Sequence, residues 1–276
     1  MLYLVATPIG NLEDITLRAL KVLKSVEILA CEDTRNTQKL LNHYEITGKK
    51  LISYHEHNEE KTSEKIISYL EEGREVALVT DAGMPCISDP GYILVEKIKK
   101  AGLPITTLPG ANAGLTALVA SGIESYNYTF YGFLPRKSKD LKLKLEEILK
   151  MNTTSILYES PYRVKNLVEE ISKISPTRKI SVARELTKMF EQIETSSAEE
   201  ILEMLGNKIK EKGEFVVIIS PNKDEKSEEV NVDELVELIY QKVQSGVKKS
   251  EAIKNIAKEF GINKKEVYSF YHEKYD

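Results

Sequence analysis

The stretch that decides the fold is VALVTDAGMPCISDPG, residues 76–91. Its first five residues form an apolar, β-branched run that is typical of a buried strand. A plain connector to a helix needs one turn, yet the loop that follows, residues 81–91, holds two acids, two glycines and two prolines. Gly83 allows a close backbone approach and Asp81 can accept hydrogen bonds, so we assign the first half of the loop to a ligand. We assign the second half to structure, with Asp89 before Pro90 capping the next helix.

The same succession of strand, rich loop and helix repeats along the first 120 residues. Strands are predicted at 2–6, 26–31, 50–54, 75–80 and 104–108, and helices near 15–24, 34–43, 59–72, 90–101 and 112–121. This alternation favours a mostly parallel sheet covered by helices, in which ligands sit beyond the carboxyl ends of the strands. Four such strands are followed by the loops TPIGN, EDTR, DAGMPCISDPG and PGANAG. We therefore expect a site at this edge of the sheet.

A second series of elements begins near residue 127. Strands are predicted at 128–133, 154–158, 179–184 and 214–220, and helices near 139–150, 162–174 and 198–211. The fold class is therefore α/β with two domains, residues 1–122 and 123–222. The polar stretch 221–231 is predicted to link them to a small helical extension, residues 232–276. In that extension the spacing of Ala257, Gly261 and Val267 suits a helix-turn-helix, although any small helical hairpin produces the same pattern.

The composition excludes several classes of protein. A hydrophobic fraction of 41% is too high for a disordered chain, and no apolar run reaches membrane-spanning length. The start, MLYLVATPIGN, has no basic leader and is not a signal peptide. Cys31 and Cys86 lack metal-type spacing, which predicts a reduced cytoplasmic protein with no disulfide framework and no metal site. The net charge of −4 argues against a surface that binds nucleic acid throughout, but it allows local basic patches.

Several motifs have both a functional and a structural interpretation. No GxGxxG or GxxxxGK[ST] is present, so the ligand is not predicted to be a dinucleotide or a P-loop triphosphate. In PGANAG, residues 109–114, the backbone N–H groups can bind an anionic oxygen, or Asn112 can simply cap the helix. EDTR, ESPYR and RELTK each place an arginine and a carboxylate after a strand, where a surface ion pair is the commoner outcome. The basic segment 136–144 is either a solvated helix start or a phosphate-contacting loop.

These motifs together resemble a known family. LVATPIGNLEDITLRAL, CEDTR, HEHNE, DAGMPCISDPG, LPGANAGLTAL, FYGFLPRK, YESPYR, RELTK and KGEFVVII occur in order from residue 2 to about residue 220. The set is similar to the bacterial ribosomal RNA small-subunit methyltransferase I family, which belongs to the tetrapyrrole-methylase-like, class III methyltransferases that use S-adenosylmethionine (SAM). Met84 and Cys86 stand where other members often have Thr and Leu. The resemblance implies two α/β domains with SAM in the cleft between them, and a homodimer. It also implies 2′-O-methylation of a cytidine ribose in the decoding region of 16S rRNA, with the small ribosomal subunit as partner.

The resemblance also implies roles for particular residues. It puts the following near SAM: Pro8, Gly10, Asp81, Ala82, Gly83, Met84, Asn112, Ala113, Tyr158, Ala183, Arg184 and Gly213. The catalytic candidates are Glu32, Asp33, Glu159, Arg163 and Glu185, and the sequence does not choose a base among the four acids. The residues expected to contact RNA are Arg35, Arg136, Lys137, Lys139 and Arg163, and Arg184 is also expected to grip phosphate.

Two other functions are compatible with the same fold. The substrate could be a small tetrapyrrole, but the PRKSKDLKLK loop and the appended helices argue against it because a small substrate needs neither. The chain could instead be a SAM- or RNA-binding ribosome assembly factor without catalysis. SAM binding without methyl transfer would distinguish that function from an enzyme.

Overall fold

The computed structural model of the chain describes residues 1–222, 232–259 and 264–275. The fold divides into two compact units, an N-terminal unit, Met1–Pro221, and a helical unit, Asn222–Asp276. Nearly all of the predicted linker lies outside the described residues, as does Gly261 of the predicted helix-turn-helix. None of the helices in the described part of the chain is long and apolar enough to cross a membrane.

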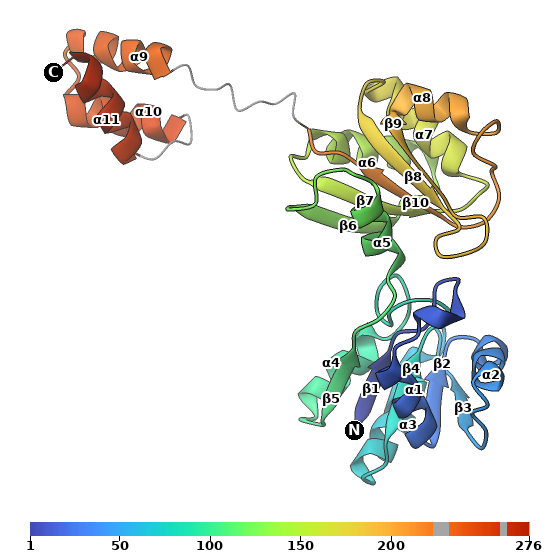
Figure 1. Cartoon of the computed structure of the whole chain (residues 1–276). Coiled ribbons are helices and arrows are strands. Elements are labelled where there is room, and N and C mark those ends of the chain that lie inside the picture. The colour runs from blue at the N-terminus through green and yellow to red at the C-terminus, as the bar shows by residue number, and fades with distance from the viewer. Residues whose placement is uncertain (223–231, 260–263, 276) are drawn as a thin grey trace. The chain divides into compact units, whose positions relative to one another are not determined.

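The N-terminal unit begins with a parallel sheet (Figure 1). Its strands are β1 (Leu2–Val5), β2 (Ile28–Cys31), β3 (Lys50–Ser53), β4 (Val76–Val79) and β5 (Ile105–Leu108), in the order β3-β2-β4-β1-β5. The connecting helices are η1 (Leu12–Asp14), α1 (Leu17–Ser25), α2 (Thr34–His43), α3 (Glu59–Glu71) and α4 (Tyr92–Lys100). All five predicted strands and these four predicted α-helices are confirmed. Because every strand pair is parallel, the loops that follow the strands share one edge.

Burial on both faces explains why the three inner strands, β1, β2 and β4, are continuously apolar. In β4, Val76 and Leu78 pack into a cluster with residues of α3 and α4. Ala77 and Val79 point to the other face, into a cluster with residues of α1 and α2. The alternation of side chains along the strand therefore places a core on each side of the sheet.

A second sheet follows in the same unit, and it is mixed rather than parallel. Its strands are β6 (Tyr128–Phe133), β7 (Thr154–Glu159), β8 (Lys179–Arg184), β9 (Gln192–Ser197) and β10 (Phe215–Ile219), in the order β6-β7-β10-β8-β9. Only β6 and β7 pair in parallel. Strand β9 was not predicted, because QIETSS has a single large apolar residue and lies at the sheet edge, half-buried throughout.

Four helices pack on the second sheet, α5 (Ala113–Ala120), α6 (Ser138–Lys150), α7 (Val164–Ile174) and α8 (Ala198–Met204). Helix α8 ends before the predicted residue 211, because Gly206 takes a φ of +83° and Leu205 pairs with Ile209. Residues of α6, α7 and α8 share one core with β7, β8 and β10.

Helix α5 covers the other face of the second sheet (Figure 1). Its residues Ala117 and Leu118 cluster with Ile156 and Ile218 of the sheet. Gly114 permits the close approach, since a Cβ at this position would lie 3.2 Å from Ile156 Cγ2. Because α5 packs on the second sheet, we propose a domain boundary just before α5 rather than at residue 122.

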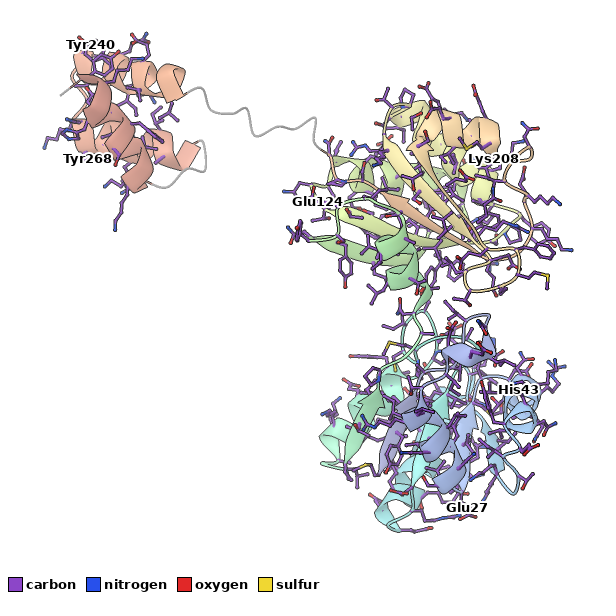
Figure 2. All side chains as sticks on the ribbon, in the orientation of Figure 1. Glu27, His43, Glu124, Lys208, Tyr240 and Tyr268 are labelled. Carbon is purple, nitrogen blue, oxygen red and sulfur yellow. The ribbon has the colours of Figure 1, made fainter. Side chains whose placement is uncertain are left out.

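The helical unit consists of α9 (Val232–Gln244), α10 (Lys249–Glu259) and α11 (Lys264–Tyr275). The predicted helical extension is present, and Ala257 and Val267 both belong to the core that its helices share. The rings of Tyr240 and Tyr275 stack with centroids 4.3 Å apart, and Tyr240 and Tyr268 mark this unit in Figure 2.

Candidate functional site

The loops after β1 and β4 are joined by hydrogen bonds. The Thr7 N–H donates to Gly83 O over 2.9 Å, and the Gly83 N–H donates to Thr7 O over 3.0 Å. Gly83 has a φ of +82°, and a Cβ there would lie 3.4 Å from Ile9 Cγ2. Part of the close backbone approach predicted at Gly83 is therefore made to Thr7 of the same chain. This contact fixes one side of the site.

The loop after β4 is held in an unusual backbone conformation. Cys86 and Ser88 have φ angles of 69° and 63°, in the left-handed region that residues with a Cβ rarely adopt. Gly91 must be glycine, because its φ is +143° and a Cβ would lie 2.6 Å from Cys86 Sγ. Gly91 is the residue that precedes α4, and no side chain caps this helix. The prediction that Asp89 caps α4 is therefore wrong.

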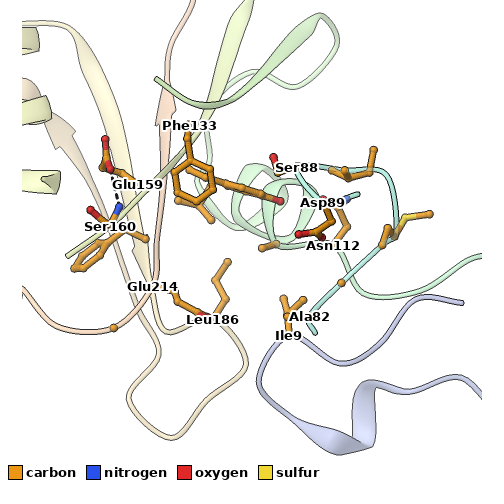
Figure 3. Close-up of a pocket in the computed structure, with 18 of the residues that line it drawn as sticks. Ile9, Ala82, Ser88, Asp89, Asn112, Phe133, Glu159, Ser160, Leu186 and Glu214 are labelled. Atoms are coloured by element: carbon orange, nitrogen blue, oxygen red, sulfur yellow. Dashed lines mark hydrogen bonds between the residues drawn. The ribbon is translucent and has the colours of Figure 1, made fainter. Parts of the chain in front are cut away.

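A pocket of about 370 Å³ lies between the loops of the first sheet and the second sheet (Figure 3). Its volume is in the range of small-molecule sites. It is lined by Ile9, Ala82, Gly83, Met84, Ile87, Ser88, Asp89, Asn112, Ala113, Phe133, Tyr158, Glu159, Ser160, Pro161, Leu186, Gly213, Glu214, Phe215 and Val216. Most of the described lining residues are apolar, three are acids, and none is Lys, Arg or His. Such a lining suits a partly apolar ligand that is neutral or cationic, and it disfavours a polyanion.

Tyr158 forms one wall of the pocket. Its ring packs edge-on against Phe130 and Phe133, with centroids 5.1 and 5.8 Å away. Its hydroxyl accepts the Gly114 N–H over 3.1 Å, and burial raises the pKa of Tyr158 above its ordinary value. Asn112 caps α5 by accepting the Leu115 N–H over 2.9 Å, as its structural interpretation predicts. Of the N–H groups of residues 109–114 that could bind an anion, that of Gly114 thus already has a partner within the chain.

The RELTK loop is packed against two glycines. Glu185 Oε1 accepts from Lys188 Nζ over 2.9 Å and from the Glu214 N–H over 3.1 Å. Burial acts to raise the pKa of Glu185, but these bonds outweigh it and hold the pKa below its ordinary value. A Cβ at Gly213 would lie 2.4 Å from Glu185 Oε1, and one at Gly10 would lie 2.5 Å from Lys188 Cγ. Gly10 and Gly213 are therefore required by the packing of the chain itself.

Asp81 points away from this pocket. Its carboxylate accepts from Asn36 Nδ2 over 2.8 Å and from the Asp33 N–H over 3.2 Å. Together with Pro8 it lines a second, smaller pocket of about 190 Å³ beside α2. Asp33 itself pairs with the exposed Arg35 at 2.6 Å, and this bond lowers the pKa of Asp33 to about 2.

Two arginines of the strand-end motifs are anchored to backbone carbonyls. Arg163 Nη2 donates to Leu134 O and Pro135 O, and lies 3.3 Å from Glu159 Oε2. Arg184 is only 7% exposed; its Nε donates to Lys212 O over 2.5 Å and its Nη1 to Phe190 O over 3.2 Å. The structure thus assigns Arg184 to holding these loops together, which corrects its predicted role in gripping phosphate.

Asp89 has the most perturbed carboxyl group of the pocket. Burial, together with the nearby charges of Glu32 and Asp81, raises the pKa of Asp89 to about 7. Burial and the charge of Asp81 also raise the pKa of Glu32, although Glu32 does not line the pocket.

The structure brings part of the predicted site together. Eight predicted residues line the pocket: Ala82, Gly83, Met84, Asn112, Ala113, Tyr158, Glu159 and Gly213. Thirteen do not, namely Pro8, Gly10, Glu32, Asp33, Arg35, Asp81, Arg136, Lys137, Lys139, Arg163, Ala183, Arg184 and Glu185. Arg136, Lys137 and Lys139 are exposed at the start of α6.

The sequence missed several lining residues. Asp89 was assigned to a helix cap, although a second acid in an already acidic loop was a signal for the site. Ile9, Leu186 and Val216 carried no signal, because an apolar residue of a pocket has the same sequence pattern as a core residue.

Comparison with known proteins identifies the family of the chain. The family described as Tetrapyrrole (Corrin/Porphyrin) Methylases matches residues 1–202. A protein of Halalkalibacterium halodurans named ribosomal RNA small subunit methyltransferase I is 45% identical over 99% of this chain and 94% of its own length. A protein of the same name from Bacillus subtilis is 44% identical over the same shares. Another, from a Hydrogenobaculum species, is 48% identical over 95% of its own length but only 79% of this chain.

Solved structures share the fold at low sequence identity. The methyltransferase CobJ matches with a TM-score of 0.59 and 18% identity, over 80% of this chain and 94% of that one. Diphthine synthase matches with a TM-score of 0.58 and 13% identity, over 79% and 89% of the two chains. These likenesses confirm the predicted two-domain α/β fold. The chain therefore belongs to the tetrapyrrole (corrin/porphyrin) methylase family, and its relatives of 42–48% identity are named ribosomal RNA small subunit methyltransferase I.

Proposed function

We propose that the chain transfers the methyl group of SAM to the 2′-hydroxyl of a cytidine in the 16S rRNA of the small ribosomal subunit. The observation that carries the proposal is the pocket, whose described lining residues include three acids and no basic residue. SAM presents its methyl group on a positively charged sulfur, so this lining is suited to it. The rRNA substrate is proposed from the names of the relatives, and the 2′-hydroxyl of a decoding-region cytidine from the resemblance of the motifs.

The residues of the pocket fit SAM in size and chemistry. A volume of about 370 Å³ is suited to a ligand the size of a nucleoside with a short chain. Ile9, Leu186 and Val216 provide apolar surface for a base, while Asn112 and Ser160 add polar groups. Asp81 and Pro8 face the second pocket, so we no longer include them among the residues proposed to contact SAM.

The acceptor hydroxyl is a weak acid, so the enzyme must orient it toward the methyl group and accept its proton. Alignment in a closed site supplies much of the acceleration in reactions of this kind. Among the predicted bases, Asp33 has a pKa of about 2 and Glu185 a lowered pKa, so both are weakly basic. Glu159 is bound to the Ser160 N–H and lies beside Arg163. These contacts argue against Asp33 and Glu185, so Glu32 and Glu159 stay in the proposed set.

Exposed basic side chains near the site are proposed to bind the RNA backbone. The Arg35 side chain is 84% exposed, and Arg136, Lys137 and Lys139 are exposed together before and in the first turn of α6. Arg163 is partly exposed beside Glu159 and remains in the proposed set. Guanidinium and ammonium groups of this kind contact phosphate, and their contribution falls as salt rises. The homodimer implied by the resemblance is likewise part of the proposal, and sedimentation of the purified protein measures it.

The test of this function is methyl transfer from labelled SAM. Small ribosomal subunits and naked 16S rRNA from cells that lack the enzyme are the two substrates, and the label is mapped by nuclease digestion and mass spectrometry. The expected product is a single 2′-O-methylcytidine in the decoding region. Label on a base, or SAM binding without transfer to either substrate, would contradict the proposal. Transfer to a tetrapyrrole instead would establish the small-molecule alternative.

A further inference from the structure

We infer that Asp89 supplies the negative charge that lets the pocket distinguish SAM from S-adenosylhomocysteine, the product that remains after methyl transfer. The two molecules differ by one methyl group and one positive charge on sulfur. A site that binds both equally would be inhibited by its own product. The inference rests on the proposed function, because it takes SAM as the ligand of this pocket.

Among the described residues, Asp89 is the lining acid whose carboxyl group has no partner. Glu159 accepts the Ser160 N–H over 2.7 Å and lies 3.3 Å from Arg163, on the side of the pocket away from Asp89 (Figure 3). Glu214 pairs with Lys188 at 2.9 Å. No hydrogen bond or ion pair of the Asp89 carboxyl is found within the described residues. Its charge is therefore the one that a ligand can neutralise.

The loop after β4 fixes the position of this carboxyl group. Asp89 follows Ser88, whose left-handed backbone has a φ of 63°, and precedes Pro90, whose ring restricts its own φ. A Cβ added at Gly132 of the β6 bulge would lie 2.9 Å from Ser88 Oγ, so the loop is packed closely against the second sheet. Strained backbone of this kind persists where the surrounding structure holds it, and it is frequent at ligand sites. The loop thus presents Asp89 to the pocket in a defined position.

The charges of Glu32 and Asp81, at the ends of β2 and β4, act on Asp89. The charge of Asp89 acts in turn on Cys86 of its own loop and on Tyr158 of β7. His55, after β3, acts in turn on Glu32. Burial, together with the two acids, favours the protonated form of Asp89, whose pKa is about 7, while Cys86 with a pKa of about 11 and Tyr158 with a raised pKa stay neutral. A cation in the pocket would favour the ionised form, so cation binding and proton release from Asp89 are linked.

Ionisation of Asp89 should strengthen SAM binding as pH rises. Below about pH 6 Asp89 is protonated in the free protein and offers a cation little charge, while above about pH 8 it is ionised. Affinity for SAM should therefore rise across this interval and then level off. Affinity for S-adenosylhomocysteine, whose sulfur is neutral, should change little, so the ratio of the two affinities rises with pH.

The experiment measures the dissociation constants of SAM and S-adenosylhomocysteine by calorimetry with the full-length protein, between pH 5.5 and 8.5. At pH 8.5 the wild type is expected to prefer SAM by about tenfold or more, which corresponds to about 1.4 kcal/mol. Asp89→Asn should lower the affinity for SAM, leave that for S-adenosylhomocysteine within about twofold, and remove the pH dependence of the ratio. Glu96→Gln is the matched control, because it makes the same acid-to-amide change on the outer surface of α4, where Glu96 pairs with Lys100. It should behave as the wild type.

The outcomes separate this inference from the proposed function. A wild-type ratio that does not change with pH overturns the inference even if Asp89→Asn does not fold. An equal loss of affinity for both ligands in Asp89→Asn also overturns it, because the residue would then support the pocket without sensing the charge. Failure of the wild type to bind either ligand would instead refute SAM as the ligand, and with it the proposed function.

Discussion

Replacement of Gly213 by alanine tests the arrangement at the base of the pocket. Gly213 has a φ of +97°, a conformation that costs a residue with a Cβ about 1–2 kcal/mol. The new Cβ would also lie 2.4 Å from Glu185 Cδ, so the carboxylate must move. The movement breaks its bonds from Lys188 Nζ and the Glu214 N–H, and a hydrogen bond to a charged group contributes about 1.5–3 kcal/mol. The backbone cost and the two lost bonds together predict a loss of about 4–8 kcal/mol in the free energy of unfolding.

Two further variants isolate the contribution of Glu185. Gly122 has a φ of +64° and nothing within 4 Å of a built Cβ, so Gly122→Ala should show only the backbone cost of about 1–2 kcal/mol. In a chain that already carries Glu185→Ala, the additional cost of Gly213→Ala should fall to the same value. Urea unfolding followed by circular dichroism gives all the values. Equal losses for Gly213→Ala and Gly122→Ala in the otherwise wild-type chain would refute the placement of Glu185.

Three other changes have defined outcomes. The pKa of Asp89 is about 7 in the folded protein and 3.8 ordinarily. Protonation of Asp89 therefore stabilises the folded state fully below about pH 4, and this stabilisation is lost as pH rises through 7. After allowance for partial exposure this amounts to about 1–2 kcal/mol, so Asp89→Asn should melt above the ligand-free wild type at pH 8 but not at pH 4. Tyr158→Phe leaves the Gly114 N–H without its acceptor and should cost about 1–2 kcal/mol in urea unfolding; no loss would contradict that bond. Arg184→Gln should lower the melting temperature, whereas an unchanged melting temperature with weaker RNA binding in a filter assay would restore its predicted phosphate role.

The first sheet could be predicted because its physical requirements appear directly in the sequence. Strands buried on both faces are continuously apolar, as in residues 76–79, and this strand is followed by a loop rich in Gly, Pro and acids. Strand β9 could not be predicted, since an edge strand such as QIETSS can be polar when one side of it faces solvent. The sheet on which α5 packs could not be predicted either, because AGLTALVA is apolar on every face and does not indicate which sheet it covers.

The candidate site could be predicted only where glycine or a polar residue had no ordinary structural reason to be present. Asp81-Ala82-Gly83 was such a place, and Ala82 and Gly83 do line the pocket. Asp81 turns toward Asn36 instead, which depends on the position of α2 and is not encoded in the loop itself. Asp89 was misassigned because an acid before Pro-Gly is also typical of a helix start.

The crystal structure of the chain with bound SAM or S-adenosylhomocysteine tests the central claim most directly. The account predicts ligand density between the loop of Ala82 and Met84 on one side and Tyr158 and Gly213 on the other, with the sulfur facing Asp89. Density in the smaller pocket beside Asp81, or on the surface away from both pockets, would contradict it.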